Sequence, residues 1–191
     1  MSKPLTLGFD TSAAYCAAAL LCGDLVVAVR AEEMGRGQAE RLMPLLEEVL
    51  AEAGNTWRDL TRIGVGIGPG NFTGIRISVA TARGLTLSLG IPAIGVSTLE
   101  AIRAGDALGT SCVPAPRDKG YVQRADQAPE LVAMADIPDP LLPPPPALLA
   151  ERIARLAARG SDNGAPPAPL YVRPADAAPA KDAPPVILDD A

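Results

Sequence analysis

Residues 64–76 read GVGIGPGNFTGIR, and the apolar run that follows them continues to Leu89. This pattern predicts a short buried strand, a glycine-rich turn and then a helix. Glycine allows positive φ angles and a close approach of two backbones, and this turn has glycine at Gly68, Gly70 and Gly74. We therefore expect the fold to be organised around this strand–turn–helix unit.

The predicted helix after the turn is unusually apolar. Between Ile75 and Leu89, the only charged residues are Arg76 and Arg83. A surface helix normally keeps one charged side, whereas a helix that is apolar nearly all round is buried on more than one side. We expect one face of this helix to cover a sheet and the other face to contact a second protein. At its start, the hydroxyl of Thr73 is placed to cap the first turn.

The composition argues against several classes of function. The chain of 191 residues is 48% hydrophobic but only 3% aromatic, so its core must be aliphatic. The net charge of −5 argues against unaided binding of nucleic acid. Histidine is absent, which excludes histidine metal sites and Ser-His-Asp triads. Three cysteines without a CxxC pair, no signal-like N-terminus and no apolar run of about 18 residues predict a cytoplasmic protein with free thiols and no membrane span.

The order of the expected elements indicates the fold class. We expect strands at residues 5–9, 15–21, 25–29, 63–67 and 91–96, and helices at 39–53, 74–89, 97–103 and 147–159. Antiparallel strands followed by βαβ units predict an α/β fold with a mixed sheet and helices on its faces. We expect a first lobe over residues 1–105, a shortened, proline-rich second lobe over 106–175 and a loose C-terminal tail over 176–191.

The glycine-rich turn does not match the common phosphate-binding motifs. A P-loop needs GxxxxGK followed by Ser or Thr, and no lysine follows this turn. The Rossmann pattern GxGxxG fails because the third glycine comes one residue late. The turn therefore has two interpretations: a tight strand-to-helix connection that serves packing, or an anion site at the N-terminus of the helix.

The polar turn after the first strand also has two interpretations. Its carboxylate and two hydroxyls are suited to hold Mg²⁺ and phosphate oxygens in an actin-like ATPase sheet, or they close the strand as an Asx or Ser/Thr turn. The candidate residues of an anion or nucleotide site are Asp10, Thr11, Ser12, Gly68, Gly70, Thr73 and Gly74. Since no other constellation supports catalysis, metal binding or a tightly bound cofactor, we expect a non-catalytic chain.

Five segments of the chain together resemble the TsaB (YeaZ) family. They are DTS at residues 10–12, GRGQAERLMP at 35–44, GPGNFTGIR at 68–76, GIP at 90–92 and GVS at 95–97. The resemblance covers about residues 4–105, and GPGNFTGIR is highly specific in this setting. LYVRP at residues 170–174 is similar to the closing segment of the family.

The resemblance implies an actin-like/Hsp70-like ATPase fold with an RNase H-like first lobe. It also implies a non-catalytic scaffold, the dimerisation subunit of the bacterial complex that forms threonylcarbamoyladenosine (t6A) in tRNA. In this family, TsaD carries the metal-binding histidines and transfers threonylcarbamoyl to adenosine 37 of tRNAs that read codons starting with A. The ATPase TsaE joins the complex. The resemblance then implies a homodimer in isolation, contact with tRNA only through the complex, and ATP or ADP with Mg²⁺ only there.

The resemblance and the apolar helices point to the same surface for binding TsaD. A standard interface buries about 800 Å² on each partner, and an apolar helix left in water promotes aggregation. The predicted interface residues are Leu42, Leu46, Val49, Ile77, Val79, Ala80, Gly84 and Leu87. Three alternatives remain: an actin-like nucleotide hydrolase that uses Asp10 and the Gly68–Gly74 turn, a homodimeric binding module with a different partner, and a second lobe that covers the apolar helix within the same chain.

Overall fold

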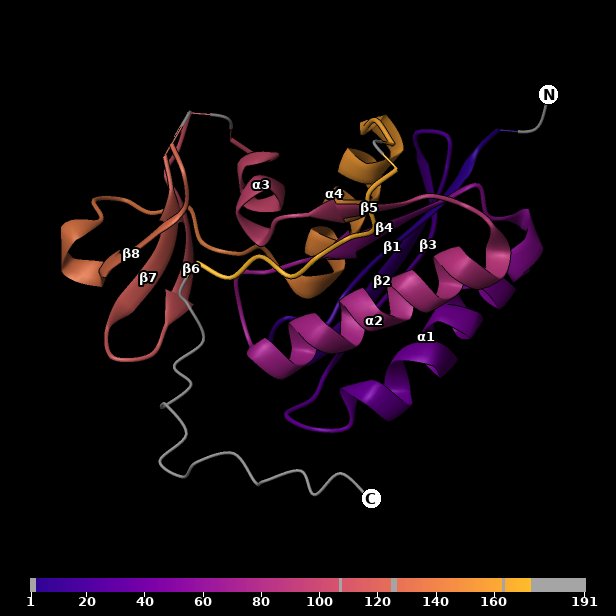
Figure 1. The fold of residues 1–191 in the computed structure, drawn as a ribbon, viewed down its shortest axis with the longest axis horizontal. Coiled ribbons are helices and arrows are strands. Elements are labelled where there is room, and N and C mark those ends of the chain that lie inside the picture. The colour runs from indigo at the N-terminus through magenta and orange to yellow at the C-terminus, as the bar shows by residue number, and fades with distance from the viewer. Residues whose placement is uncertain (1–2, 107, 125–126, 163, 173–191) are drawn as a thin grey trace, which may run out of the picture.

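The computed structural model of the protein describes residues 3–106, 108–124, 127–162 and 164–172. Figure 1 shows a larger sheet with helices on both faces and a second, smaller sheet beside it. Among the described residues, none of the helices combines the length and apolar character needed to cross a bilayer. The tail predicted over residues 176–191 lies outside the described residues.

The elements follow the predicted order of three strands, helix, strand, helix, strand and helix, which is confirmed. The strands are β1 (Leu5–Asp10), β2 (Tyr15–Cys22), β3 (Leu25–Glu33), β4 (Arg62–Gly66), β5 (Ala93–Val96), β6 (Ser111–Ala115), β7 (Lys119–Gln123) and β8 (Glu130–Ala133). The helices are α1 (Gln38–Glu52), α2 (Phe72–Leu89), α3 (Thr98–Arg103) and α4 (Pro146–Arg159), with short 3-10 turns η1 (Trp57–Asp59) and η2 (Met134–Asp136).

The larger sheet has five strands in the order β3-β2-β1-β4-β5. β2 pairs antiparallel with both β1 and β3, whereas β1, β4 and β5 run parallel. The predicted mixed sheet is therefore confirmed. Because β1 and β4 run in the same direction, the polar turn after β1 and the glycine-rich turn after β4 leave the sheet at the same edge.

Alternation along the strands separates the two faces of this sheet. Leu7 belongs to the core cluster that α1 and α2 cover. Gly8 and Gly64 face the other way, where Cβ atoms added to them would lie 2.6 and 2.7 Å from the Cβ atoms of Ala154 and Ala157 in α4. Helix α4 packs closely on this face because strand glycines meet helix alanines.

The described residues beyond 105 include a three-stranded antiparallel sheet, β6-β7-β8, and helix α4. The small sheet packs on α3, where Leu99 and Val113 share one apolar cluster. Helix α4, which we expected in the second lobe, packs on β1, β2 and β4 of the larger sheet. Its buried residues Leu149 and Ile153 cover a face that would otherwise be open to water. The lobe boundary near residue 105 stays a prediction.

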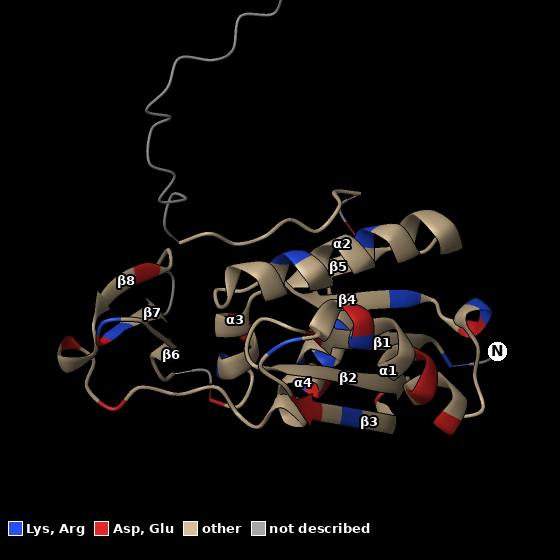
Figure 2. Cartoon of the chain, turned by 90° about the horizontal axis from the view of Figure 1, so that it is seen from below, with Lys and Arg blue, Asp and Glu red and all other residues tan. Residues whose placement is uncertain are grey.

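Residues 164–172, which we call the C-terminal strap, run beside α2 from its C-terminal end toward its N-terminal end (Figure 2). At one end, Pro166 lines a pocket of about 470 Å³ together with Leu87 of α2. Farther along, the N–H of Leu170 donates to the carbonyl oxygen of Ile67 at 2.8 Å. The strap therefore joins the chain after α4 to the loop that precedes α2.

Candidate functional site

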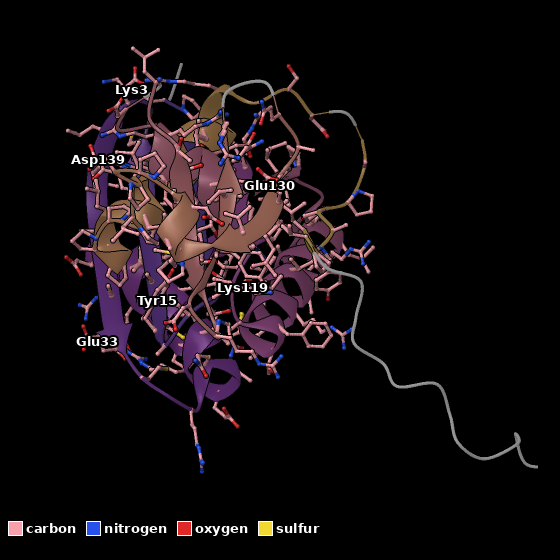
Figure 3. All side chains as sticks on the ribbon, turned by 90° about the vertical axis from the view of Figure 1, so that its left-hand side faces the viewer. Lys3, Tyr15, Glu33, Lys119, Glu130 and Asp139 are labelled. Carbon is pink, nitrogen blue, oxygen red and sulfur yellow. The ribbon has the colours of Figure 1, made fainter. Side chains whose placement is uncertain are left out.

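Asp10, the last residue of β1, is fully buried. Its Oδ2 accepts hydrogen bonds from the N–H of Ser12 at 3.2 Å, the Ser12 hydroxyl at 2.7 Å and the Tyr15 hydroxyl at 2.5 Å. Its Oδ1 is buried without a hydrogen-bond partner among the described residues. Burial raises the pKa of Asp10 despite these donors, and burial next to Asp10 also raises the pKa of Tyr15. Tyr15 is labelled in Figure 3, which shows the molecule from the side of the small sheet.

The polar turn and the glycine-rich turn interlock through one side-chain and one backbone hydrogen bond. The Thr11 hydroxyl donates to the carbonyl oxygen of Gly74 at 2.7 Å, and the N–H of Asn71 donates to the carbonyl oxygen of Ser12 at 2.6 Å. A Cβ atom added to Gly74 would lie 1.8 Å from the Thr11 oxygen, and one added to Gly70 would lie 2.4 Å from the Ser12 oxygen. These two glycines are needed because a side chain would occupy the space of the polar turn.

This arrangement does not fit hydrated Mg²⁺ and phosphate at the polar turn. The hydroxyls of Thr11 and Ser12 donate to protein oxygens, and both residues are buried. The remaining oxygen of Asp10 faces Gly66, where an added Cβ atom would lie 2.0 Å from Oδ1. Within the described part of the chain, no cluster of three or more His, Cys, Asp or Glu residues is placed to hold a metal. The buried hydrogen bonds of Thr11 and Ser12 are those of the packing interpretation, and the anion or nucleotide site stays a prediction.

The other two candidates in the glycine-rich turn, Gly68 and Thr73, are not placed to share one binding site. Gly68 has a φ angle of 90° and faces the Ile75 side chain. Thr73 is exposed and does not cap α2. The N-cap is Asn71, whose side-chain oxygen accepts from the N–H of Gly74 at 2.9 Å. The predicted cap was wrong because α2 begins at Phe72, one residue before Thr73.

The buried carboxyl predicts an unusual dependence of stability on pH. The unfolded chain releases the Asp10 proton near the ordinary pKa of 3.8, and the folded chain releases it at higher pH. Between these two values the folded state holds more protons, so the contribution of Asp10 to the free energy of unfolding falls as the pH rises. Relative to an Asp10→Asn variant, wild type should lose stability from about pH 4 toward pH 7, as measured by urea unfolding.

Asp59 is the control of opposite sign in this experiment. It is exposed, and hydrogen bonds from Thr56 lower its pKa. Its contribution to stability is lost as the pH falls below the unfolded pKa of 3.8, so the Asp59→Asn difference should grow up to about pH 4 and then stay constant while the Asp10→Asn difference changes. A constant difference between wild type and Asp10→Asn across this range would contradict the assignment for Asp10.

Part of the predicted partner interface is buried in the core of this chain, and the prediction is corrected for those residues. Leu42, Leu46 and Val49 of α1 have no exposed surface, and Val79 of α2 is 3% exposed. The apolar residues of α1 recur at helical spacing because that stripe faces the sheet. Ile77 is half-buried against the same core. Four of the eight predicted interface residues therefore belong to the core of this chain and offer no surface to a partner.

The outer side of α2 holds the remaining three predicted interface residues. Ala80 and Gly84 are exposed, and Leu87 is 88% exposed. The described residues of the second lobe, including the strap, therefore leave this side of α2 uncovered. On α1, which lies beside α2 (Figure 1), Met43 is 37% exposed. Met43 was not among the predicted interface residues, although its position between the buried residues of an amphipathic helix indicates an outward-facing side chain.

The mixed five-stranded sheet, with helices on both faces and a polar turn at the edge of its parallel strands, defines an actin-like, RNase H-like α/β fold. An uncharacterized protein from Pseudomonas aeruginosa, described as similar to peptidase YEAZ, has a TM-score of 0.72 at 23% identity and covers 89% of this chain and 100% of its own. YeaZ from the same organism has a TM-score of 0.61 at 26% identity, with coverage of 72% and 70%.

Sequence comparison identifies the family. A family model described as "TsaD: tRNA N6-adenosine threonylcarbamoyltransferase" matches residues 29–115. An uncharacterized protein of Mycobacterium tuberculosis is 34% identical over 186 residues, which cover 82% of this chain and 85% of that protein. The tRNA threonylcarbamoyladenosine biosynthesis protein TsaB of Escherichia coli is 36% identical over 99 residues, which cover 52% of this chain and 42% of that protein. The chain belongs to the TsaB (YeaZ) family.

Proposed function

We propose that this chain is a non-catalytic scaffold in the formation of t6A and that it binds TsaD through the outer side of α1 and α2. TsaD transfers threonylcarbamoyl to adenosine 37 of tRNAs that read codons starting with A, and TsaE joins the assembly. Relatives in E. coli and Bacillus subtilis are named as threonylcarbamoyladenosine biosynthesis proteins, and the matching family model is named for TsaD. tRNA and nucleotides meet this chain only within that assembly.

The observation that carries this proposal is the exposed leucine with small residues on the outer side of α2. Leu87 is 88% exposed, and Ala80 and Gly84 beside it carry no bulky side chain. Small residues let a partner helix approach closely, while an exposed leucine gains free energy when a partner covers it. Met43 of α1 is 37% exposed and lines a separate pocket with Leu85 and Leu89 of α2. A helix pair from a second protein is the shape that covers two parallel ridges of this kind.

The alternative as a nucleotide hydrolase has weaker support. It needs Asp10 and the Gly68–Gly74 turn to face a ligand, and the side chains of Thr11 and Ser12 are instead bonded within the protein. We also propose that the chain forms a homodimer in isolation, because exposed apolar surface on α2 is available to a second copy. A homodimeric module with a different partner is the remaining alternative, and the binding experiment below distinguishes it.

Binding to TsaD should depend on one exposed leucine of α2. A mixture of the chain with its cognate TsaD at micromolar concentration is expected to elute as one complex, with its mass measured by light scattering. Leu87→Asp should abolish this complex, because the apolar contact of Leu87 is lost and burial of a carboxylate in the interface is costly.

Leu108→Asp is the matched control for this variant. Leu108 is 94% exposed and lies in the connection between α3 and β6, outside α2. The control variant should bind TsaD like wild type. Two separate peaks with wild type would contradict the proposed function, and loss of binding with both variants would show that Leu87 has no special place in the interface.

A further inference from the structure

Four exposed residues line one side of α2. Arg76, Ala80, Arg83 and Leu87 follow one another at intervals of three or four residues, which places them on one face of the helix. Gly84 is exposed next to Arg83. We call these five residues the α2 stripe. The α2 stripe combines two cations with small and apolar side chains. A partner therefore has to provide both negative charge and apolar surface.

Among the residues that the structure describes, the two arginines of the α2 stripe have no acidic partner. In the described residues, the ion pairs involve other arginines, namely Arg30, Arg41, Arg124, Arg155 and Arg159. Figure 2 shows two basic segments and no acidic segment on α2. Arg76 and Arg83 are thus available to carboxylates that come from another molecule.

Arg76 is held in place by two aromatic rings. Its guanidinium lies 3.8 Å from the ring centroid of Phe72, and its Nε donates to the Tyr171 hydroxyl at 3.1 Å. The rings of Phe72 and Tyr171 stack with centroids 5.3 Å apart, and the two residues are 42% and 44% exposed. A guanidinium fixed in this way loses little conformational entropy on binding. Aromatic residues and arginine are also the residues enriched at binding hot spots.

We infer that the α2 stripe docks a helix of TsaD that presents one carboxylate to Arg76 and a second to Arg83, an inference that rests on the proposed binding of TsaD. A bulky apolar side chain of that helix packs over Ala80 and Gly84, which leave room for it. The terminal nitrogens of Arg76 bind the first carboxylate, since its Nε is already engaged by Tyr171. Tyr171, from the C-terminal strap, is a positioning residue for Arg76.

A helix of a different protein fits the α2 stripe better than nucleic acid or a second copy of this chain does. Nucleic acid is disfavoured because the chain carries a net charge of −5 and the stripe has apolar residues between its two cations. A second copy can cover the apolar part of this surface, but its own α2 has no carboxylate to offer to Arg76 and Arg83. An acidic helix from a different protein meets neither difficulty.

The test measures the dissociation constant for TsaD by calorimetry with single variants of the full chain. Arg76→Glu should weaken binding by about 30-fold or more, and Arg83→Glu by about tenfold. Arg159→Glu, on α4 at the opposite face of the sheet, should change it by less than about twofold. Tyr171→Phe should weaken binding by about threefold in wild type and have no further effect in an Arg76→Ala background. The melting temperature should be unchanged in each case.

The outcomes separate this inference from the proposed function. If Arg76→Glu and Arg83→Glu bind TsaD as wild type does while Leu87→Asp does not bind, the inference is overturned and the proposed function stands. Failure of the unmodified chain to bind TsaD overturns both. The inference also falls if these arginine variants weaken only the binding of tRNA to the isolated chain, or only the dissociation constant of its own dimer.

Discussion

Gly74→Ala should lower the free energy of unfolding by about 3 kcal/mol or more, at the upper end of the cost of overpacking. The added methyl would lie 1.8 Å from the carbonyl oxygen of Thr11, and a backbone oxygen cannot move away as a flexible side chain can. Relief of this contact would also break the hydrogen bond from the Thr11 hydroxyl to Gly74. Urea denaturation, followed by circular dichroism, measures the effect directly.

Gly84→Ala is the matched control on the same helix. A Cβ atom at Gly84 meets nothing within 4 Å, and alanine is a better helix former than glycine. This variant should gain about 0.5–1 kcal/mol of stability. If both alanine variants proved equally stable, the interlock between the polar turn and the glycine-rich turn would not be a structural requirement.

The second large effect is expected for Leu46→Ala, which distinguishes core from interface on α1. Leu46 has no exposed surface and lies in the main core cluster, so its truncation should cost about 2–5 kcal/mol. Because Leu46 offers no surface to a partner, the folded variant should bind TsaD with unchanged affinity. Thermal unfolding and the dissociation constant, measured on one sample, give the two quantities.

Leu87→Ala should behave in the opposite way. The side chain is 88% exposed, so its truncation should change stability by less than about 0.5 kcal/mol. Loss of an apolar contact in the proposed interface should weaken the binding of TsaD by about tenfold, which corresponds to about 1.4 kcal/mol. If Leu46→Ala weakened binding without loss of stability, the correction of the predicted interface would be wrong.

Local patterns were sufficient to predict most of the fold. The alternation and helical spacing of apolar residues are properties of neighbouring positions, and they placed the elements of the first 105 residues in the correct order. The glycine-rich turn was recognised because its residue types are restrictive. The motif GPGNFTGIR also indicated the TsaB (YeaZ) family, to which the chain belongs.

The candidate sites were harder to predict because they depend on contacts between distant segments. The hydroxyl of Thr11 meets the carbonyl oxygen of Gly74 across 63 positions of sequence, and no local pattern specifies that contact. Tyr15 was not considered as a partner of Asp10, although it opens the neighbouring strand. Tyr171 reaches Arg76 only because the strap returns along α2.

The sequence by itself determined the α/β class, the strand–turn–helix unit and the presence of a helix too apolar for an ordinary surface. Only the tertiary structure decided which side of that helix is free. A helix that is apolar nearly all round has no charged face to mark its solvent side, so periodicity could not separate Val79, which is buried, from Leu87, which is exposed. Burial is set by what packs against a residue, and that depends on the whole chain.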